Sequence, residues 1–162
     1  MNNKLYIAAA GAGKTTFLTK HAIDLLKNDS DTKSIAIITY TQKNQEVILD
    51  RIKNEVGYIP NQIKVMGWYS FILDYCVRPF MGAVIDSLYC TNVGLLLVEG
   101  ISNTQKVNGK YFTTYSVKNL KDKFLTKENY FYSDKLSEFA YSCYQKNKKI
   151  FMKVFIAFAW IL

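Results

Sequence analysis

The stretch that decides the fold is Ala8 to Thr15, which reads AAAGAGKT. It fits a pattern of Ala or Gly, four residues of any kind, and then Gly-Lys followed by Ser or Thr. Gly11 and Gly13 permit backbone conformations that turn successive N–H groups inward around a phosphate. The apolar run Leu5 to Ala9 predicts a buried strand before this turn, and a helix is predicted after it. A strand, a glycine-rich turn and a helix in this order predict a phosphate-binding loop.

Two side chains of this loop indicate that it binds a nucleotide with Mg²⁺. Lys14 is placed to reach the β- and γ-phosphates as a point charge, and the Thr15 hydroxyl is the expected Mg²⁺ ligand. ATP and Mg²⁺ are therefore the expected cofactors. The alternative is a small-residue turn between a strand and a helix, in which Lys14 is incidental. The predicted nucleotide-binding residues are Ala8, Ala9, Ala10, Gly11, Ala12, Gly13, Lys14, Thr15 and Thr16, and Thr15 is also the predicted metal ligand through Mg-ATP.

Strands and helices alternate in the sequence after the loop. The continuous apolar run within Ser34 to Thr39 is typical of a strand covered on both faces, as in a parallel sheet. Thr41 is placed to cap a helix that runs to about Val56, and Gly57 fits the position after the helix end. The order predicts an α/β fold with a parallel sheet and flanking helices. The other elements predicted here are a helical apolar face (Phe17, Leu18, Ala22, Leu25, Leu26), a strand (Ile63–Met66) and a helix (Ser70–Val77).

Composition places the chain among globular proteins that lack a membrane span. Of 162 residues, 49% are hydrophobic and 21% charged, and no apolar run reaches the 18 residues of a spanning helix. The net charge of +8 favours an anionic partner, although a solvated lysine-rich surface explains it equally well. Three cysteines without a C-x-x-C spacing support neither a disulfide framework nor a zinc site. No signal peptide is apparent, so we expect a cytoplasmic protein without a membrane partner.

The small residues of the loop resemble those of superfamily 1 DNA helicases of the UvrD/Rep type, in which the loop also lies near the N-terminus. The segment from Thr39 to Asn44, TYTQKN, resembles helicase motif Ia, T-F-T-N-K-A. The segment from Gly67 to Phe71, GWYSF, resembles motif Ib, T-F-H-S-F, but has Gly67 and Tyr69 in place of the usual Thr and His. The resemblance implies a RecA-like P-loop NTPase core whose motifs Ia and Ib contact single-stranded DNA. The nucleic-acid-binding residues that it implies are Thr39, Tyr40, Thr41, Lys43, Trp68, Tyr69 and Ser70.

Each of these positions also has a structural interpretation. Thr41 is expected to cap a helix whether or not it contacts DNA, and Trp68 and Tyr69 suit core packing as well as base stacking. Phe71 is expected in the core. Several charged residues suit either a basic DNA path or a solvated surface, with surface favoured for most: Asp74, Arg78, Lys110 and the lysines from Lys118 to Lys127.

The second half of the chain departs from the helicase pattern. Residues 1–80 are predicted as the core, 81–148 as an insertion of small helices and strands, and 149–162 as an apolar terminal strand. In the family, an apolar strand followed by D-E-x-Q-D supplies the acids that hold Mg²⁺ and polarise water. Here Lys153 to Leu162 is the candidate strand, Ala157 stands where the first Asp is expected, and no Asp or Glu follows Glu138. No catalytic residues are therefore assigned, and we expect an incomplete core from a truncated or frame-shifted helicase.

The resemblance implies an ATP-hydrolysing motor that translocates on DNA and unwinds it. For this chain alone we expect nucleotide binding without unwinding. A non-enzymatic protein that binds DNA or a helicase and interferes with it is the main alternative. A small P-loop kinase is disfavoured because its lid needs several arginines and the chain has only Arg51 and Arg78. A regulatory GTPase is disfavoured by the lack of an N-K-x-D motif.

Overall fold

A computed structural model describes residues 6–7, 9, 11–28, 34–107, 110–113, 119–156 and 158–161. Contacts divide the chain into two compact units. The first consists of Met1–Gly67 and Ala157–Leu162, and the second of Trp68–Ile156. The sequence-based division continued the core to residue 80, whereas the helical segment after Gly67 packs on a helix of the second unit.

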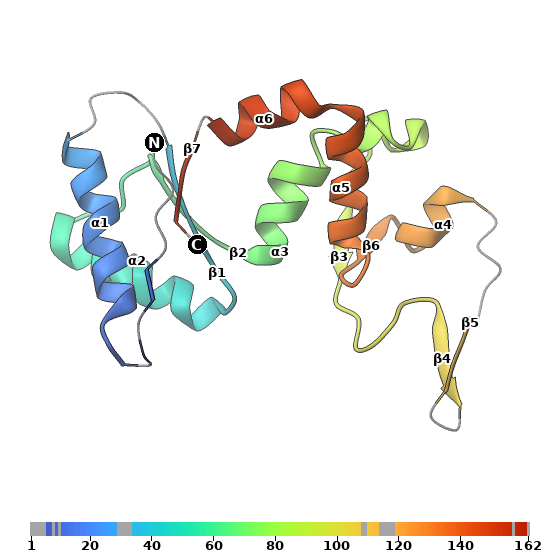
Figure 1. Ribbon diagram of the computed structural model, residues 1–162, viewed down its shortest axis with the longest axis horizontal. Helices are drawn as coiled ribbons and strands as arrows, with labels where there is room; N and C mark the ends of the chain where they lie inside the picture. The colour runs from blue at the N-terminus through green and yellow to red at the C-terminus, as the bar shows by residue number, and fades with distance from the viewer. Residues whose placement is uncertain are drawn as a thin grey trace. The chain divides into compact units, whose positions relative to one another are not determined.

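The first unit is built on a three-stranded parallel sheet in the order β2-β1-β7 (Figure 1). The central strand β1 has buried residues at all four of its interior positions, 35 to 38. This burial confirms the interpretation of the continuous apolar run as an interior strand. The strand bounds are Ser34–Thr39 for β1, Ile63–Gly67 for β2 and Phe158–Ile161 for β7.

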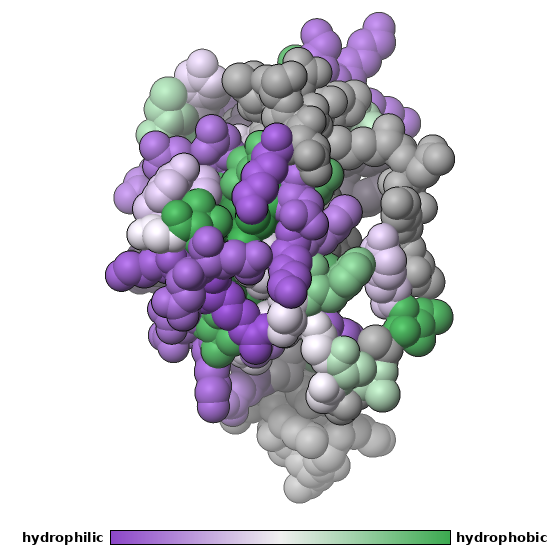
Figure 2. All heavy atoms as spheres, turned by 90° about the vertical axis from the view of Figure 1, so that its left-hand side faces the viewer, coloured by the Kyte–Doolittle hydropathy of each residue, from purple (hydrophilic) through white to green (hydrophobic). Residues whose placement is uncertain are grey.

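Two helices of fifteen residues, α1 (Lys14–Asn28) and α2 (Gln42–Val56), pack on this sheet. At the start of α2 the Thr41 hydroxyl accepts a hydrogen bond from the Asn44 backbone N–H at 3.2 Å. Gly57 ends α2 at φ 89°, and its N–H donates to the Lys53 carbonyl at 2.8 Å. Both predicted caps are therefore confirmed. The outward surfaces of the two helices are mainly hydrophilic (Figure 2).

The core of the first unit lies between these helices and one face of the sheet. Ile35 and Ile37 of β1 are paired in register with Ile63 and Val65 of β2, so four apolar side chains share that face. Helix residues close over them. The buried helix members of the cluster are Ala22, Ile48 and Ile52, with Leu18, Leu25, Leu26 and Val56 partly buried against it.

The predicted apolar face of α1 is wrong at Phe17. This side chain is 45% exposed and lies against the rings of Tyr6, at 4.8 Å, and His21, at 6.0 Å. Position 17 lies about 140° round the helix from Ala22, so the two residues cannot face the same surface. Ile23, only 2% exposed, is the buried apolar residue that the pattern missed.

The predicted buried strand from Leu5 to Ala9 is not supported at the residues that can be checked. Tyr6, Ile7 and Ala9 lie outside regular secondary structure, and Ile7 is 90% exposed. Leu5, Ala8 and Ala10 lie outside the described residues.

The second unit combines short helices with two small two-stranded sheets. β3 pairs with β6 in parallel, and β4 pairs with β5 in antiparallel. Its core is aromatic: the ring of Phe139 lies 5.0 Å from that of Phe124 and 4.7 Å from that of Phe131. The elements are α3 (Trp68–Phe71), the π-helix η1 (Ile72–Val77), the 3-10 helices η2 (Met81–Ala83) and η3 (Asp86–Leu88), β3 (Gly94–Leu96), β4 (Thr104–Val107), β5 (Lys110–Thr113), α4 (Leu120–Phe124), β6 (Tyr130–Tyr132), α5 (Leu136–Lys146) and α6 (Lys148–Ile156).

The predicted terminal strand begins later than expected. Residues 153–156 belong to α6, and β7 starts only at Phe158. The ring of Phe151, 8% exposed, lies 5.0 Å from Phe80 and 5.5 Å from Tyr144, so α6 is tied to the second unit by aromatic packing. No helix in the described parts of the chain is long and apolar enough to cross a membrane.

Candidate nucleotide-binding site

The described part of the loop adopts left-handed backbone conformations at both glycines. Gly11 has φ 78° and Gly13 has φ 79°, a region that residues with a Cβ rarely adopt. A Cβ at either position would meet no atom within 4 Å, so the dihedral angle, and not lack of space, requires glycine there. Between them, the Ala12 N–H donates to the Ala9 carbonyl at 3.3 Å and closes a tight turn.

Helix α1 begins directly after Gly13. The Phe17 N–H donates to the Gly13 carbonyl at 2.9 Å, so the hydrogen bonds of α1 begin at the second glycine of the loop. The first turn contains no acidic residue. The positive end of the helix dipole therefore faces the loop without a neutralising carboxylate in that turn, which suits a bound anion.

The Lys14 ammonium lies at this loop. Its Nζ donates to the Ala9 carbonyl oxygen at 2.6 Å, five residues earlier in the chain, and the side chain is exposed. Lys14 thus folds back across the turn formed by Gly11 and Gly13. The arrangement brings one ammonium group and the start of α1 to a single turn of backbone.

Hydroxyl groups continue along the first turns of α1. Thr15 is half-buried, and its backbone carbonyl accepts a hydrogen bond from the Thr19 hydroxyl at 2.8 Å. Thr19 itself is only 2% exposed. This bond lies one helical turn beyond Lys14 and leaves the Thr15 carbonyl satisfied. Thr15 contributes a hydroxyl at the position where Mg²⁺ ligation is predicted.

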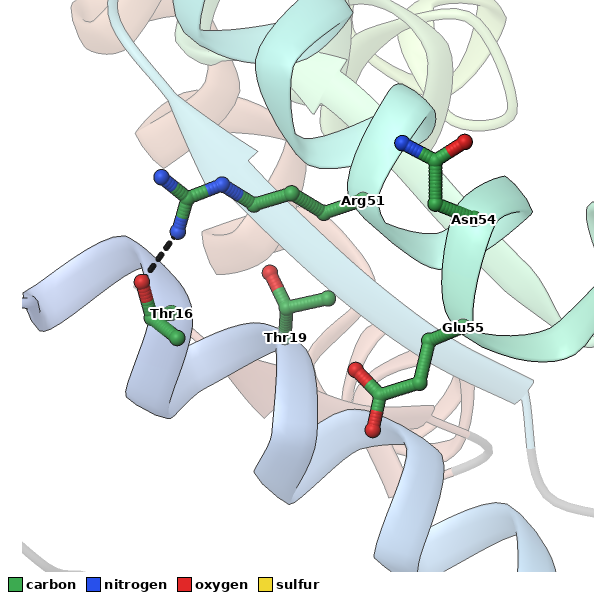
Figure 3. A pocket seen from close by; sticks show the side chains of 5 residues that line it. All are labelled: Thr16, Thr19, Arg51, Asn54 and Glu55. Carbon is green, nitrogen blue, oxygen red and sulfur yellow. Dashed lines mark hydrogen bonds between the residues drawn. The ribbon is translucent and has the colours of Figure 1, made fainter.

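Arg51 of α2 reaches α1 beside this first turn. One of its guanidinium N–H groups donates to the Thr16 hydroxyl, and Figure 3 shows the side chain extended from α2 toward α1. A pocket of about 320 Å³ lies between the two helices. Its lining residues are Thr16, Thr19, Arg51, Asn54 and Glu55. Sequence reasoning did not place Arg51 here, because 35 residues separate it from Thr16 and no local pattern links them.

The segment that resembles motif Ia leaves the sheet at the carboxyl end of β1. Thr39, the last residue of β1, is paired with Gly67, the last residue of β2. Figure 1 shows α1 starting at the same end of the sheet. Tyr40 is 85% exposed, and Thr41 and Lys43 are exposed as well. Within the first unit, the phosphate-binding loop and this predicted DNA-binding segment therefore both lie toward the end of the sheet where β1 and β2 finish.

The segment that resembles motif Ib opens the second unit. The Trp68 ring lies 5.8 Å from Phe71, and Trp68 is half-buried. Tyr69 is 41% exposed and Ser70 is exposed, whereas Phe71 is 6% exposed, as expected for a core residue. The exposed tyrosine ring and serine hydroxyl are the groups of this segment that a nucleic acid can reach.

Two of the charged residues considered for a DNA path are held by each other. Arg78 forms an ion pair with Asp74 and also donates to the Val93 carbonyl at 2.8 Å. Lys123 forms an ion pair with Glu138. The side chains of Lys110 and Lys118 lie outside the described residues. Arg78 and Lys123 are therefore accounted for by interactions within the second unit.

The bounds of β7 change where the acidic residues of the helicase motif would be expected. Catalytic acids follow a core strand, but Ala157 precedes β7, which runs in parallel with β1 from Phe158 to Ile161. Ala157 itself lies outside the described residues. The carboxyl end of β7 is at Ile161, four residues after Ala157, and the comparison of Ala157 with the first Asp of the helicase motif stays a prediction.

Comparison with known proteins links the first part of the chain to one family. Residues 1–71 match the family model of the UvrD/REP helicase N-terminal domain. This range contains the loop, both fifteen-residue helices and the motif Ia-like segment, and it ends at Phe71 in the motif Ib-like segment. No curated protein matches the chain.

Proposed function

Because residues 1–71 match the family model of the UvrD/REP helicase N-terminal domain, we propose that this chain is an ATP-binding module of that family. The observation that carries the proposal is the left-handed conformation at Gly11 and Gly13, followed at once by Lys14 and the start of α1. These features bring an ammonium group and a helix N-terminus to one glycine turn, where both would stabilise a bound phosphate. A turn with a purely structural role needs neither group.

Phosphate binding would require the Lys14 ammonium to exchange the Ala9 carbonyl for phosphate oxygens. The start of α1 would add the positive end of its helix dipole at the same anion. The hydroxyl of Thr15 fits a share in Mg²⁺ binding, because this ion takes few protein ligands and keeps waters and phosphate oxygens around it. When bound, Mg²⁺ would supply positive charge that offsets that of the phosphates.

We propose nucleotide binding without turnover for this chain. Hydrolysis by P-loop NTPases needs an acidic residue at the end of a core strand to hold Mg²⁺. Residues 139–162 contain no Asp or Glu that could take this role. Translocation and unwinding belong to the intact family, which uses a second motor domain.

A titration with a fluorescent ATP analogue in the presence of Mg²⁺ tests this function. We expect Lys14→Ala to weaken binding at least about tenfold, because a charge-assisted contact with phosphate contributes about 1.5–3 kcal/mol. Lys20→Ala is the matched control, since Lys20 is exposed on α1 beyond the first turn, and it should bind like the wild type. Equal affinities for wild type and Lys14→Ala would refute the phosphate-loop assignment.

We further propose that the segments at Thr39–Lys43 and Trp68–Ser70 contact single-stranded DNA. The position of Thr39 at the end of β1 supports this for the first segment, which leaves the sheet there. Exposed hydroxyls at such an edge are suitable donors to phosphate, and Tyr40 and Tyr69 offer exposed rings to bases.

The alternative of a non-enzymatic DNA-binding protein rests on the same exposed segments and makes a different prediction. It requires salt-sensitive binding of single-stranded DNA without ATP, and no effect of Lys14→Ala on that binding. Fluorescence anisotropy of labelled single-stranded DNA, with and without Mg-ATP, distinguishes this alternative from the ATP-binding module. A small kinase finds less support, since Arg78 is held by Asp74 and Val93 and is not available to close over a substrate.

A further inference from the structure

Three aromatic rings lie together beside the phosphate-binding loop. Tyr6 precedes the loop, and Phe17 and His21 lie one turn apart on α1. The ring centroids of Tyr6 and Phe17 are 4.8 Å apart. Those of Phe17 and His21 are 6.0 Å apart, with the two planes 9° from parallel. These three residues are called the aromatic cluster below, and the predicted nucleotide-binding residues include none of them.

The aromatic cluster is only partly buried. Tyr6 is 52% exposed and Phe17 45%, and His21 is half-buried. Aromatic side chains stabilise a fold mainly through the apolar area that they remove from water. The buried core position of α1 is instead Ala22, on another side of the helix. Packing among the described residues therefore leaves much of the Tyr6 and Phe17 rings accessible to a ligand.

The aromatic cluster shares one side of α1 with Lys14. At about 100° per residue, Phe17 lies about 60° round the helix from Lys14, and His21 about 20°. With a rise of about 1.5 Å per residue, Phe17 is about 4.5 Å and His21 about 10.5 Å farther along the helix axis than Lys14. Tyr6 contacts Phe17 from the segment that enters the loop. The ammonium proposed to bind phosphate and the exposed rings are therefore neighbours.

Exposed rings next to a phosphate site have the chemistry to bind a nucleobase. A nucleotide carries a flat aromatic base at one end and its anionic phosphates at the other. With the phosphates at Lys14 and the start of α1, ring faces are available along the same side of the helix. Stacking on aromatic side chains binds bases and needs only an accessible ring face.

We propose that the aromatic cluster is the base-binding part of the nucleotide site, with Tyr6 and Phe17 as the stacking surface. The inference rests on the nucleotide binding proposed above. It adds the class of base, because the fused rings of a purine offer more stacking area than the single ring of a pyrimidine. His21 enlarges the surface by stacking on Phe17. The base is therefore bound by side chains outside Ala8–Thr16.

A purely structural role for the aromatic cluster makes a different prediction. In that role the contact between Tyr6 and Phe17 only ties the segment before the loop to α1. Loss of such a tie alters the loop and weakens the binding of any phosphate ligand. Loss of a base-binding surface weakens only those ligands that carry a base.

Calorimetric titration of the whole chain with Mg-ATP, and with inorganic tripolyphosphate in the presence of Mg²⁺, distinguishes these two roles. Tripolyphosphate has the phosphates of ATP and no base. We expect Tyr6→Leu and Phe17→Leu each to weaken Mg-ATP binding about fivefold or more, because each variant removes a stacking ring. The affinity for tripolyphosphate should stay unchanged in both.

Tyr58→Leu is the matched control. Tyr58 is 63% exposed and follows Gly57 at the end of α2. Because α2 starts near the carboxyl end of β1 and has fifteen residues, Tyr58 is about 22 Å of helix away from that end of the sheet. This variant should bind both ligands like the wild type. Tyr6→Phe, which keeps the ring, should also bind both like the wild type.

The proposal also predicts a preference among nucleotides. The wild type should bind Mg-ATP and Mg-GTP several-fold more tightly than Mg-CTP and Mg-UTP. Phe17→Leu should reduce this difference, because less ring area remains for stacking. A preference that survives unchanged in Tyr6→Leu and Phe17→Leu would place the base elsewhere.

Three other results would overturn the proposal. Unchanged Mg-ATP affinity in Tyr6→Leu and Phe17→Leu would show that no base lies on these rings. Equal losses of affinity for Mg-ATP and tripolyphosphate would assign the aromatic cluster a structural role. A wild type that binds neither ligand would refute the phosphate-loop proposal and this inference with it. Should Phe17→Leu unfold the protein, Tyr6→Leu against Tyr6→Phe gives the same reading, since Tyr6 lies outside regular secondary structure.

Discussion

Gly11 and Gly13 show how much of the candidate site depends on the identity of single residues. Glycine is required at both because of their positive φ angles, and the sequence pattern alone indicated this. The role of Arg51 was not predictable in the same way. Its contact with Thr16 joins residues 35 positions apart, and it depends on how α1 and α2 pack on the sheet.

Replacement of Gly13 distinguishes a loss of stability caused by backbone strain from a loss of nucleotide binding. Gly13→Ala and Gly57→Ala each place a Cβ on a left-handed residue, at φ 79° and 89° respectively. Both should lower the free energy of unfolding by about 1 kcal/mol in urea titrations. Only Gly13→Ala should also weaken binding of the ATP analogue. Equal nucleotide affinities of the two variants would contradict the role given to the loop.

The contact between Arg51 and Thr16 is expected to position the first turn of α1. Arg51→Gln and Thr16→Val should each weaken nucleotide binding a few-fold, and the double variant should be no weaker than either. Arg51→Lys should restore part of the affinity. Both partners are exposed, so the change in unfolding free energy should be about 1 kcal/mol or less. Additive losses of affinity would show that the two residues act separately.

At the scale of elements, local signals predicted α2 and β1 well. The helix start at Thr41, its end at Gly57 and the strand at Ser34–Thr39 depend on neighbouring residues only, and the structure agrees with all three. The run from Lys153 to Leu162 was misjudged because periodicity does not distinguish a short apolar helix from a strand. Phe151 packs against Phe80, which is distant in sequence, and against Tyr144, which lies on another helix. This packing decides that α6 continues to Ile156.

The cap of α2 supplies a prediction at this scale. Thr41→Ala removes the acceptor for the Asn44 N–H and should lower the free energy of unfolding by about 1 kcal/mol. Thr41→Ser keeps the acceptor and should stay within a few tenths of a kcal/mol of the wild type. Urea unfolding measures both. If the two variants are equally stable, the cap observed in the structure does not contribute to stability.

At the scale of the whole molecule, the reactivity of the three cysteines tests the packing of the second unit. Burial raises the pKa of Cys76 to about 12, and burial with a smaller effect of Cys76 raises that of Cys143 to about 12, from 9.0 for both. Cys90 is exposed. At pH 8 a colorimetric thiol reagent should therefore modify one cysteine rapidly and the other two only upon unfolding. Rapid reaction of all three thiols would contradict the packing of η1 against α5.

The same shifts give the second unit a pH dependence. Unfolded thiols ionise above about pH 9, whereas both buried thiols stay protonated in the folded protein up to about pH 12. The unfolded state thus releases protons first, and the free energy of unfolding should fall between pH 9 and pH 12. Cys76→Ala/Cys143→Ala should remove this contribution, which unfolding in urea at several pH values detects.

The arrangement of the sheet was only partly accessible from the sequence. Alternating strands and helices predicted a parallel sheet, and the structure has one. The pairing of β7 with β1 joins residues more than 120 positions apart, and no local pattern specifies such a neighbour.

Amide hydrogen exchange of the whole chain with and without Mg-ATP tests the central claim most directly, because it locates the bound nucleotide. We predict slower exchange on addition of Mg-ATP in peptides covering Gly11 to Phe17, where the loop and the first turn of α1 lie. The Lys14→Ala variant should lose this protection. Unchanged exchange in this segment at saturating Mg-ATP, or protection confined to other segments, would contradict a nucleotide site at this loop.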